Sequence, residues 1–151
     1  MRMSSGTPPP GAGRDILVVD DSSDIRNLLR LHLSGAGYQV RLAEDAIEAG
    51  RMLLERSPDL MIADIGMPYM DGFEFVSSIL ADGTVPIFPI IFLSSRDDAE
   101  DRAQVLGIPC VKKPITADRL LAVVAGALEK AAERQAVSPS PRAASPRAPG
   151  R

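Results

Sequence analysis

One stretch organises the chain: Asp64-Ile65-Gly66-Met67-Pro68-Tyr69-Met70-Asp71-Gly72. It follows Pro58-Asp59-Leu60-Met61-Ile62-Ala63, a short and mainly apolar run that is typical of a buried strand. Asp64 therefore falls where a strand ends and a loop begins, and ligands bind at that edge of an open α/β sheet. Asp71 and Gly72 predict a turn, with Asp71 stabilising it or capping the helix that follows.

Four further stretches have the composition of strands, and a helical pattern follows each of the five. The other strands are predicted at 16–19, 38–42, 89–93 and 110–112. The helices are predicted from a Ser22 or Ser23 cap to Gly35, and over about 45–55, 72–80, 97–106 and 116–134. This alternation predicts an α/β fold, a doubly wound five-stranded parallel sheet with helices on both faces and right-handed crossovers.

Two of the helices carry specific expectations about their inner faces. The helix over about 45–55 is expected to turn Ile47, Leu53 and Leu54 inward. Gly50 inside it lowers helix propensity by about 1 kcal/mol relative to alanine, which suggests a close-packing contact there. The helix over about 72–80 is expected to face the sheet with four side chains, Phe73, Val76, Ile79 and Leu80.

Composition predicts one folded unit over about 14–136, between a disordered leader, 1–13, and a disordered Pro/Ser/Arg-rich tail, 137–151, with no further domain. The lone cysteine, Cys110, allows no internal disulfide, and no apolar run approaches the roughly 20 residues of a membrane span. These features predict the cytoplasm. Residues 1–14 and 138–151 together carry five arginines and no acids, so the rest of the chain holds 12 basic and all 20 acidic residues, a net charge of −8. An acidic body argues against direct nucleic acid binding.

The candidate functional side chains share one position, the carboxyl end of a predicted strand, and they are Asp20, Asp21, Asp64, Ser94 and Lys113. Such ends lie side by side in a doubly wound sheet. Three carboxylates in one pocket repel each other, and Mg²⁺, which prefers hard oxygen ligands, would relieve that repulsion. We expect Asp21 and Asp64 as direct ligands, Asp20 as a direct or water-mediated one, and the carbonyl of Gly66 as a further oxygen.

The same pocket predicts phosphoryl chemistry. Asp64 could attack phosphorus while Mg²⁺ and the ammonium of Lys113 neutralise the equatorial oxygens. Ser94 could donate a hydrogen bond to one of those oxygens. The product would be an acyl phosphate on Asp64, which water can later cleave.

These residues resemble a known family. The Asp64 to Gly72 stretch, Asp20-Asp21 and Lys113-Pro114 are similar to the motifs of response-regulator receiver domains of bacterial two-component signalling, and the resemblance covers about 15–134. It implies the CheY-like, flavodoxin-like (βα)5 fold with strand order 2-1-3-4-5. It also implies roles: Asp64 as phosphoacceptor, Asp20 and Asp21 as Mg²⁺ acids, Ser94 as switch hydroxyl and Lys113 as phosphate contact.

The resemblance implies partners as well. The donor would be the phosphohistidine of a sensor histidine kinase or of a phosphotransfer protein. The chain would be a single-domain regulator that switches partner binding or relays the phosphate, and it would catalyse only its own phosphorylation and dephosphorylation. Its output face would consist of the fourth helix, the fifth strand and the fifth helix.

Three departures from the family pattern bear on that output. Cys110 stands where the family usually has Tyr or Phe, so the familiar coupling between the switch hydroxyl and an aromatic ring is not available. The span from Ser94 to Lys113 is short, which predicts a short fourth helix. Ser95 stands where Ala is common, and Gly66 and Arg96 occupy positions that tune dephosphorylation in the family.

Other functions remain open on the sequence. The chain could be a receiver-like binding module that is never phosphorylated, and Cys110 gives that alternative some support. It could be a Mg²⁺-dependent phosphatase that forms an aspartyl phosphate, but similar haloacid-dehalogenase-like enzymes carry a second Asp where this chain has Gly66. A flavin site is disfavoured because Asp20 and Asp21 follow the first strand, where a phosphate-cradling loop would be needed.

Overall fold

The computed structural model describes residues 13–67, 70–83, 87–95, 103–104 and 106–137. Strands and helices alternate along the chain in the order β1 (Asp15–Val19), α1 (Ser23–Gly35), β2 (Gln39–Ala43), α2 (Ala46–Glu55), β3 (Leu60–Asp64), α3 (Gly72–Ala81), β4 (Ile90–Ser94), β5 (Cys110–Lys112) and α5 (Ala117–Val137). The five strands form one parallel sheet in the order β2-β1-β3-β4-β5. This architecture confirms the predicted doubly wound fold and its strand order.

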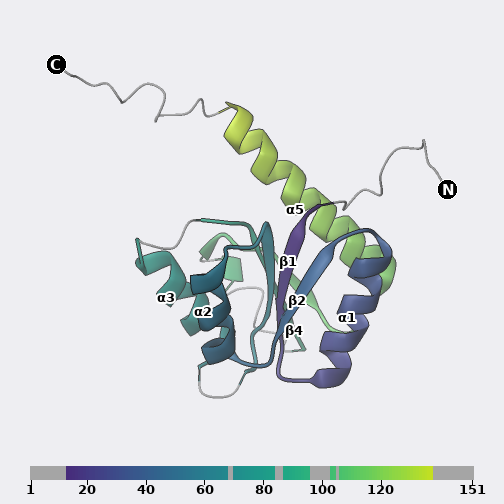
Figure 1. The fold of residues 1–151 in the computed structure, drawn as a ribbon, viewed down its shortest axis with the longest axis horizontal. Helices are drawn as coiled ribbons and strands as arrows, with labels where there is room; N and C mark the ends of the chain where they lie inside the picture. The colour runs from purple at the N-terminus through teal and green to yellow at the C-terminus, as the bar shows by residue number, and fades with distance from the viewer. Residues whose placement is uncertain (1–12, 68–69, 84–86, 96–102, 105, 138–151) are drawn as a thin grey trace.

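Two apolar layers, one on each face of the sheet, hold the fold together. Leu17 and Val19 of β1 belong to a cluster with α2 and α3, while Ile16 and Val18 belong to a cluster with α1 and α5. Figure 1 shows the same division, with α2 and α3 on one side of the strands and α1 and α5 on the other. Because alternate residues of a strand point to opposite faces, a strand covered on both sides must be apolar along its covered length, and β1 is apolar from Ile16 to Val19.

The helix starts follow the capping residues that the sequence predicts. The Ser22 hydroxyl accepts a hydrogen bond from the main-chain N–H of Ile25 at the start of α1. Asp71 forms a reciprocal capping box with Glu74 at the start of α3, which confirms Asp71 as a cap. Thr116 caps α5 by accepting from the main-chain N–H of Arg119.

The predicted inner face of α2 is wrong in two of its three residues. Ile47 is 69% exposed and Leu54 is 82% exposed, and only Leu53 of the three lies inside. The buried side chains are Ala46, Ala49 and Leu53. Helical rotation places these three on one stripe, and small alanines let the helix lie close to the sheet, so the larger aliphatic residues turn outward.

The interpretation of Gly50 is also wrong. A Cβ atom built on Gly50 meets nothing within 4 Å, so no close contact requires glycine there. In α3, Phe73 and Val76 are buried as predicted, but Leu80 is 48% exposed. The strand predicted from Pro89 begins one residue later, at Ile90.

Several expectations fall on residues that the structure does not describe. The leader and the tail lie outside the described residues, apart from their boundary positions. Most of the helix predicted over about 97–106 does too, although 103, 104 and 106 are helical. Among the described residues, no helix is both long and apolar enough to cross a lipid bilayer.

A charged cluster, not anticipated from the sequence, joins three elements at the amino edge of the sheet. The Asp15 carboxylate accepts from Arg41 of β2 at 2.8 Å and lies 3.5 Å from the guanidinium of Arg56, which follows α2. The main-chain N–H of Asp15 donates to the Asp59 carboxylate at 2.7 Å. Arg41 also donates to the main-chain oxygen of Arg56. We call Asp15, Arg41, Arg56 and Asp59 the amino-edge cluster.

Candidate functional site

Asp64 is the last residue of β3 and lies at the centre of the carboxyl edge of the sheet. Its register partner on β4 is Leu93, whose carbonyl accepts from the main-chain N–H of Ile65 at 3.0 Å. The Ile65 carbonyl in turn accepts from Gly72 N–H at 2.9 Å, which closes the loop that carries the predicted motif. Asp64 is only 5% exposed, so its carboxylate is held in a mostly buried position.

Gly72 is required where the loop returns to the end of β3. A Cβ atom at this position would lie 2.6 Å from the main-chain oxygen of Asp64 and 2.9 Å from the Cα of Ile65. Both contacts are with backbone, which cannot move aside as a flexible side chain can. Glycine therefore lets the start of α3 pack directly against the residue that the sequence predicts to be reactive.

Asp20, directly after β1, is fully buried and held by several hydrogen bonds. Its main-chain N–H donates to the carbonyl of Ala43 at 3.1 Å, and its Oδ1 accepts from the N–H of Ser22 at 2.9 Å. Its Oδ2 accepts from the ammonium of Lys113 at 2.9 Å. Asp21, the next residue, is exposed and opens onto solvent.

Lys113 bridges two acids from different strands. Its Nζ lies 2.9 Å from Asp20 Oδ2 and 3.2 Å from Asp64 Oδ1. The backbone of Lys113 is held beside the end of β4, because its main-chain N–H donates to the carbonyl of Ser94 at 2.8 Å. Ser94 is the last residue of β4 and is 2% exposed, so it is buried at the same edge.

The three acids are close enough to share one cation. Asp20, Asp21 and Asp64 each offer a carboxylate oxygen, and these oxygens lie within 4.8 Å of one another. Asp20 already uses both oxygens in hydrogen bonds, which leaves Asp21 and Asp64 as the freer donors. A set of hard oxygen donors with two buried members suits a divalent cation such as Mg²⁺.

Burial and charge shift the pKa values of the two central groups. Burial, and next the neighbouring Asp20 carboxylate, raise the pKa of Asp64, and the opposing attraction of Lys113 does not offset them. Burial lowers the pKa of Lys113, but the hydrogen bond to Asp20 and the charges of Asp64 and Asp20 raise it further, so the net shift is upward. The lysine therefore stays charged, while the charge on Asp64 is costly without a further cation.

Three of the remaining positions singled out in the sequence are described: Gly66, Ser95 and Cys110, of which Ser95 is exposed. Gly66 is exposed, its N–H donates to Asp64 Oδ1 at 3.4 Å, and a Cβ atom there would meet nothing within 4 Å. Cys110 is partly buried at the start of β5 and packs against the cluster that includes Phe92. Arg96, the other position expected to tune dephosphorylation, lies outside the described residues.

Arg26 is a site-positioning residue that the sequence reasoning missed. Its guanidinium Nη1 donates to the main-chain oxygen of Asp20 at 2.7 Å. It therefore holds the backbone of the loop that carries Asp20 and Asp21. The available signal was an arginine in the second turn of the helix that follows two acids, a spacing that lets a long side chain reach back over the helix start.

Fold and site together define a doubly wound α/β protein with an acidic, lysine-bridged pocket at the carboxyl edge of its sheet. The model of the family "Response regulator receiver domain" matches residues 16–125, and the chain belongs to that family. The family generally binds Mg²⁺ at an acidic pocket of this kind.

Relatives agree with this assignment. The response regulator MprA of Mycobacterium tuberculosis is 38% identical over 110 residues, which is 71% of this chain and 47% of that protein. The chain thus spans about half the length of the curated relatives it matches. NtrX from Brucella abortus is 35% identical with a TM-score of 0.76, over 83% of this chain and 29% of that one. Chemotaxis protein CheY4 of Vibrio cholerae is 30% identical with a TM-score of 0.70, over 77% of this chain and 99% of that one.

Proposed function

We propose that Asp64 accepts a phosphoryl group and that the chain works as a phosphorylation-dependent switch or relay in two-component signalling. One observation carries the proposal: Asp64 is buried at the carboxyl edge, shares Lys113 with Asp20, and lies with Asp20 and Asp21 in a triad able to share one cation. A lone acid at a strand end has many structural uses, but a lysine bridge and three converging carboxylates serve the transfer of an anionic group.

The proposed reaction transfers a phosphoryl group from the donor's phosphohistidine to Asp64, with no change of oxidation state. A carboxylate oxygen of Asp64 forms a bond to phosphorus as the bond between phosphorus and the donor's histidine nitrogen breaks. The electron pair of the broken bond stays on the imidazole nitrogen. The ammonium of Lys113, which contacts the Asp64 carboxylate before the reaction, would contact a phosphoryl oxygen after it. The buried Ser94 hydroxyl would donate a hydrogen bond to another phosphoryl oxygen.

Bound Mg²⁺ would supply positive charge to the phosphoryl oxygens. Asp21 and Asp64 are the proposed direct ligands, because Asp20 is occupied by Ser22 N–H and Lys113. Asp20 would act directly or through water, and the Gly66 carbonyl would add an oxygen from the loop. The raised pKa of Asp64 is consistent with this assignment, since a divalent cation favours the ionised form.

Partners follow from family membership rather than from the pocket itself. A sensor histidine kinase or a phosphotransfer protein is the proposed donor. The proposed output protein binds the face formed by the fourth helix, β5 and α5, of which the fourth helix lies largely outside the described residues. We further propose that the chain turns over no substrate other than its own aspartyl phosphate, and that it works in the cytoplasm without binding nucleic acid.

The test is the intact mass of the full chain after incubation with Mg²⁺ and acetyl phosphate. We expect one phosphoryl adduct on the parent protein, loss of that adduct with EDTA, and no adduct on Asp64→Ala. Asp59→Ala is the matched control, because Asp59 is an acid at the opposite edge of the sheet, and it should still form the adduct.

If the phosphoryl adduct decays before its mass can be measured, a second measurement still tests the site: the binding of beryllofluoride in the presence of Mg²⁺. An adduct that survives in Asp64→Ala would contradict the proposed acceptor. Absence of both the adduct and beryllofluoride binding would instead favour the receiver-like module that is not phosphorylated. Steady release of phosphate from small phosphomonoesters would favour the phosphatase alternative.

A further inference from the structure

A groove with an apolar floor crosses the amino edge of the sheet, away from the acidic pocket. Its larger cavity has a volume of about 300 Å³ and lies between the start of β4, the segment before β5 and the last turns of α5. A smaller cavity of about 130 Å³ continues it toward the end of α3. Leu80, Ile87, Phe88 and Ile90 line both cavities, so the two form one surface, which we call the amino-edge groove.

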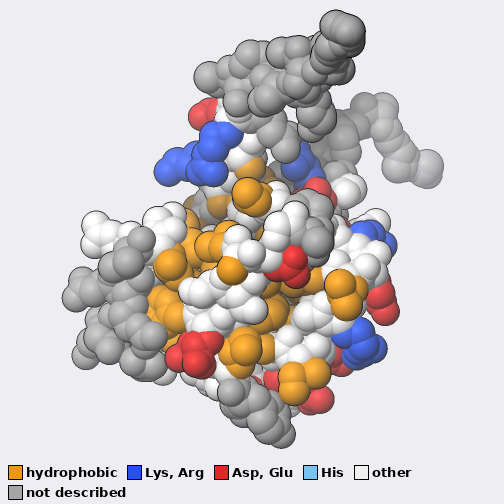
Figure 2. Space-filling view, turned by 90° about the vertical axis from the view of Figure 1, so that its left-hand side faces the viewer, with side chains coloured by type: hydrophobic (Ala, Val, Ile, Leu, Met, Phe, Trp, Pro, Cys, Tyr) orange, Lys and Arg blue, Asp and Glu red, His pale blue; other side chains and the backbone are white. Residues whose placement is uncertain are grey.

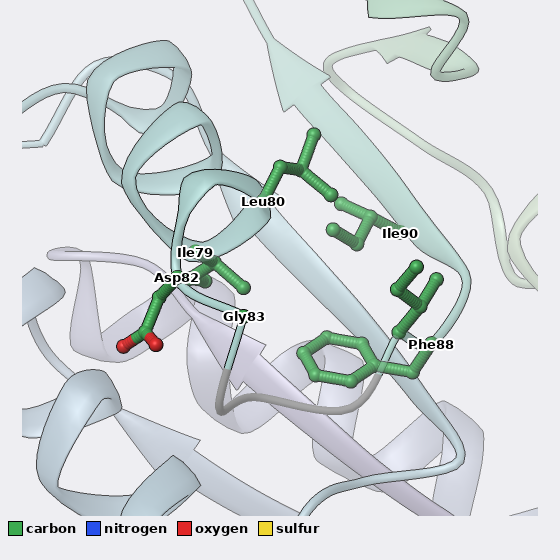
Figure 3. Close-up of a pocket in the computed structure, with 7 residues that line it drawn as sticks. Ile79, Leu80, Asp82, Gly83, Phe88 and Ile90 are labelled. Atoms are coloured by element: carbon green, nitrogen blue, oxygen red, sulfur yellow. The ribbon is translucent and has the colours of Figure 1, made fainter.

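Two aliphatic side chains on the floor of the groove are exposed to solvent. Ile87 is 90% exposed and Leu80 is 48% exposed, beside the largely buried Phe88 and Ile90. Figure 3 shows Ile79, Leu80, Phe88 and Ile90 gathered around the smaller cavity, with the Asp82 carboxylate turned away from them. Apolar side chains collected in a groove, rather than scattered singly, mark a contact surface.

One wall of the groove is basic. Ala127, Lys130 and Arg134 line the larger cavity from α5, at a spacing of three and four residues that puts them on one stripe. Figure 2 shows apolar side chains across the middle of this side of the molecule and, above them toward the projecting end of α5, basic side chains with acidic ones beside them. Within the part of the chain that the structure describes, neither Lys130 nor Arg134 forms an ion pair.

Two like charges four residues apart on a helix repel each other. Glu129 and Glu133 are also on α5, but the charged α5 side chains that line the larger cavity are Lys130 and Arg134. A partner with acidic side chains would relieve that repulsion. An apolar floor beside a cationic wall matches a segment that places large apolar side chains on one side and carboxylates along its edge.

We propose that the amino-edge groove docks an acidic, amphipathic helical segment of a partner protein. The chain's own ends do not have this chemistry: residues 1–12 and 138–151 contain arginines, no acid, and no aliphatic side chain of the size of leucine. The groove lies at the opposite edge of the sheet from Asp64, so this docking does not rest on the proposed phosphoryl chemistry. It borders the proposed output face through Leu106 and α5, and in that respect the inference rests on the proposed function and specifies the kind of partner.

The probe is a synthetic amphipathic peptide of about 18 residues, or five helical turns, made of leucine and glutamate. A matched peptide carries lysine in place of every glutamate. Binding to the full chain is measured by fluorescence anisotropy, and the bound surface is mapped from the methyl signals of isoleucine and leucine. We expect the glutamate peptide to bind at least about tenfold more tightly than the lysine peptide and to shift the signals of Leu80, Ile87 and Ile90.

Charge reversal gives the sharpest variant. Lys130→Glu combined with Arg134→Glu should reverse the preference between the two peptides, and Ile87→Asp should abolish binding of the glutamate peptide. The matched controls are Arg30→Glu, an exposed arginine on α1, and Leu54→Asp, an aliphatic 82% exposed on α2. Both control variants should bind the glutamate peptide as the parent chain does.

Four results would overturn the proposal. The first is equal affinity for the two peptides, and the second is a preference that survives the charge reversal. The third is a change in peptide affinity on replacing Arg142, Arg147 and Arg151 by Glu, which would indicate that the tail occupies the groove. The fourth is a concentration-dependent mass in sedimentation that Ile87→Asp abolishes, which would identify a second copy of this chain as the occupant.

Discussion

The ionised carboxylate of Asp64 is expected to lower the stability of the folded chain. Burial and the Asp20 carboxylate raise its pKa, so at neutral pH the folded state holds a charge that the unfolded state accommodates more easily. We expect Asp64→Asn to increase the free energy of unfolding near pH 7 in the absence of Mg²⁺. The gain should exceed about 0.5 kcal/mol, the range of an ordinary surface substitution.

The pH dependence of that gain has a defined sign. Above the raised folded-state pKa of Asp64, the aspartate is ionised in both states and the full cost is present. As the pH falls through that pKa, the folded parent takes up a proton and regains stability. Urea unfolding of both proteins at a series of pH values that falls from neutral should therefore show a difference that shrinks toward acid. A difference that grows toward acid would contradict the assigned cause.

Arg26 is expected to stabilise the loop that presents the acids. Arg26→Gln removes the 2.7 Å hydrogen bond to the main-chain oxygen of Asp20, a fully buried residue. Loss of a charged donor to a buried acceptor costs about 1–3 kcal/mol, measurable by urea unfolding. Arg30→Gln, an exposed arginine one turn further along α1, should change stability by less than about 0.5 kcal/mol. Equal effects of the two substitutions would argue against a specific role for Arg26.

At the scale of elements, two glycines in helices make opposite predictions. Gly72→Ala places a Cβ atom 2.6 Å from the Asp64 main-chain oxygen, so α3 must move away from β3. We expect a loss of more than about 2 kcal/mol, as for other forced overpacking, and weaker Mg²⁺ binding because Asp64 shifts with the loop. Gly50→Ala meets nothing within 4 Å and should instead stabilise α2 by up to about 1 kcal/mol.

Thermal unfolding with and without Mg²⁺ measures both glycine variants together. We expect Mg²⁺ to raise the melting temperature of the parent and of Gly50→Ala alike, while Gly72→Ala should lose most of that rise. If Gly72→Ala kept the parent's stability and Mg²⁺ response, the close approach between α3 and β3 would not matter for the site.

At the scale of the whole molecule, the amino-edge cluster ties β1 and β2 to the end of α2. Asp15→Asn removes the charge that Arg41 and Arg56 share and leaves a largely buried guanidinium without its partner. We expect a loss of about 2 kcal/mol in urea unfolding with an unchanged m-value. The exposed pair of Arg51 and Glu48, 3.5 Å apart, is the control, and Arg51→Gln should cost less than about 0.5 kcal/mol. If Asp15→Asn and Arg51→Gln lowered the free energy of unfolding equally, the amino-edge cluster would contribute no more stability than an exposed ion pair.

The two edges of the sheet divide the molecule by chemistry. The carboxyl edge gathers Asp20, Asp64 and Lys113, and the amino edge holds both the charged cluster of Asp15 and the groove beside Ile87. A parallel sheet makes this division possible, because all strands end on one side and all begin on the other. Substitutions at one edge can therefore test one proposed activity while the other serves as an internal control.

The order of elements and the placement of site residues at strand ends were predictable from local pattern. Short apolar runs such as Leu60 to Ala63 and the alternation of strands with helices depend on neighbouring residues only, and so do caps such as Asp71. The inner face of α2 was not predictable in the same way. Ile47 and Leu54 are apolar enough to be core residues. Ala46 and Ala49 face the sheet instead, because their small side chains let α2 lie close to it.

The sequence by itself determined that this chain is a doubly wound α/β protein with acids and a lysine at the carboxyl ends of its strands, because strand and helix periodicity and parallel topology follow from local composition. Only the tertiary structure decided that Lys113 bridges Asp20 and Asp64, that Gly72 must lie against the Asp64 backbone, and that Ile87 and Arg134 share a groove. The physical reason is distance along the chain. Lys113 and Asp20 are 93 residues apart in sequence, and only the packing of five strands brings their atoms to 2.9 Å.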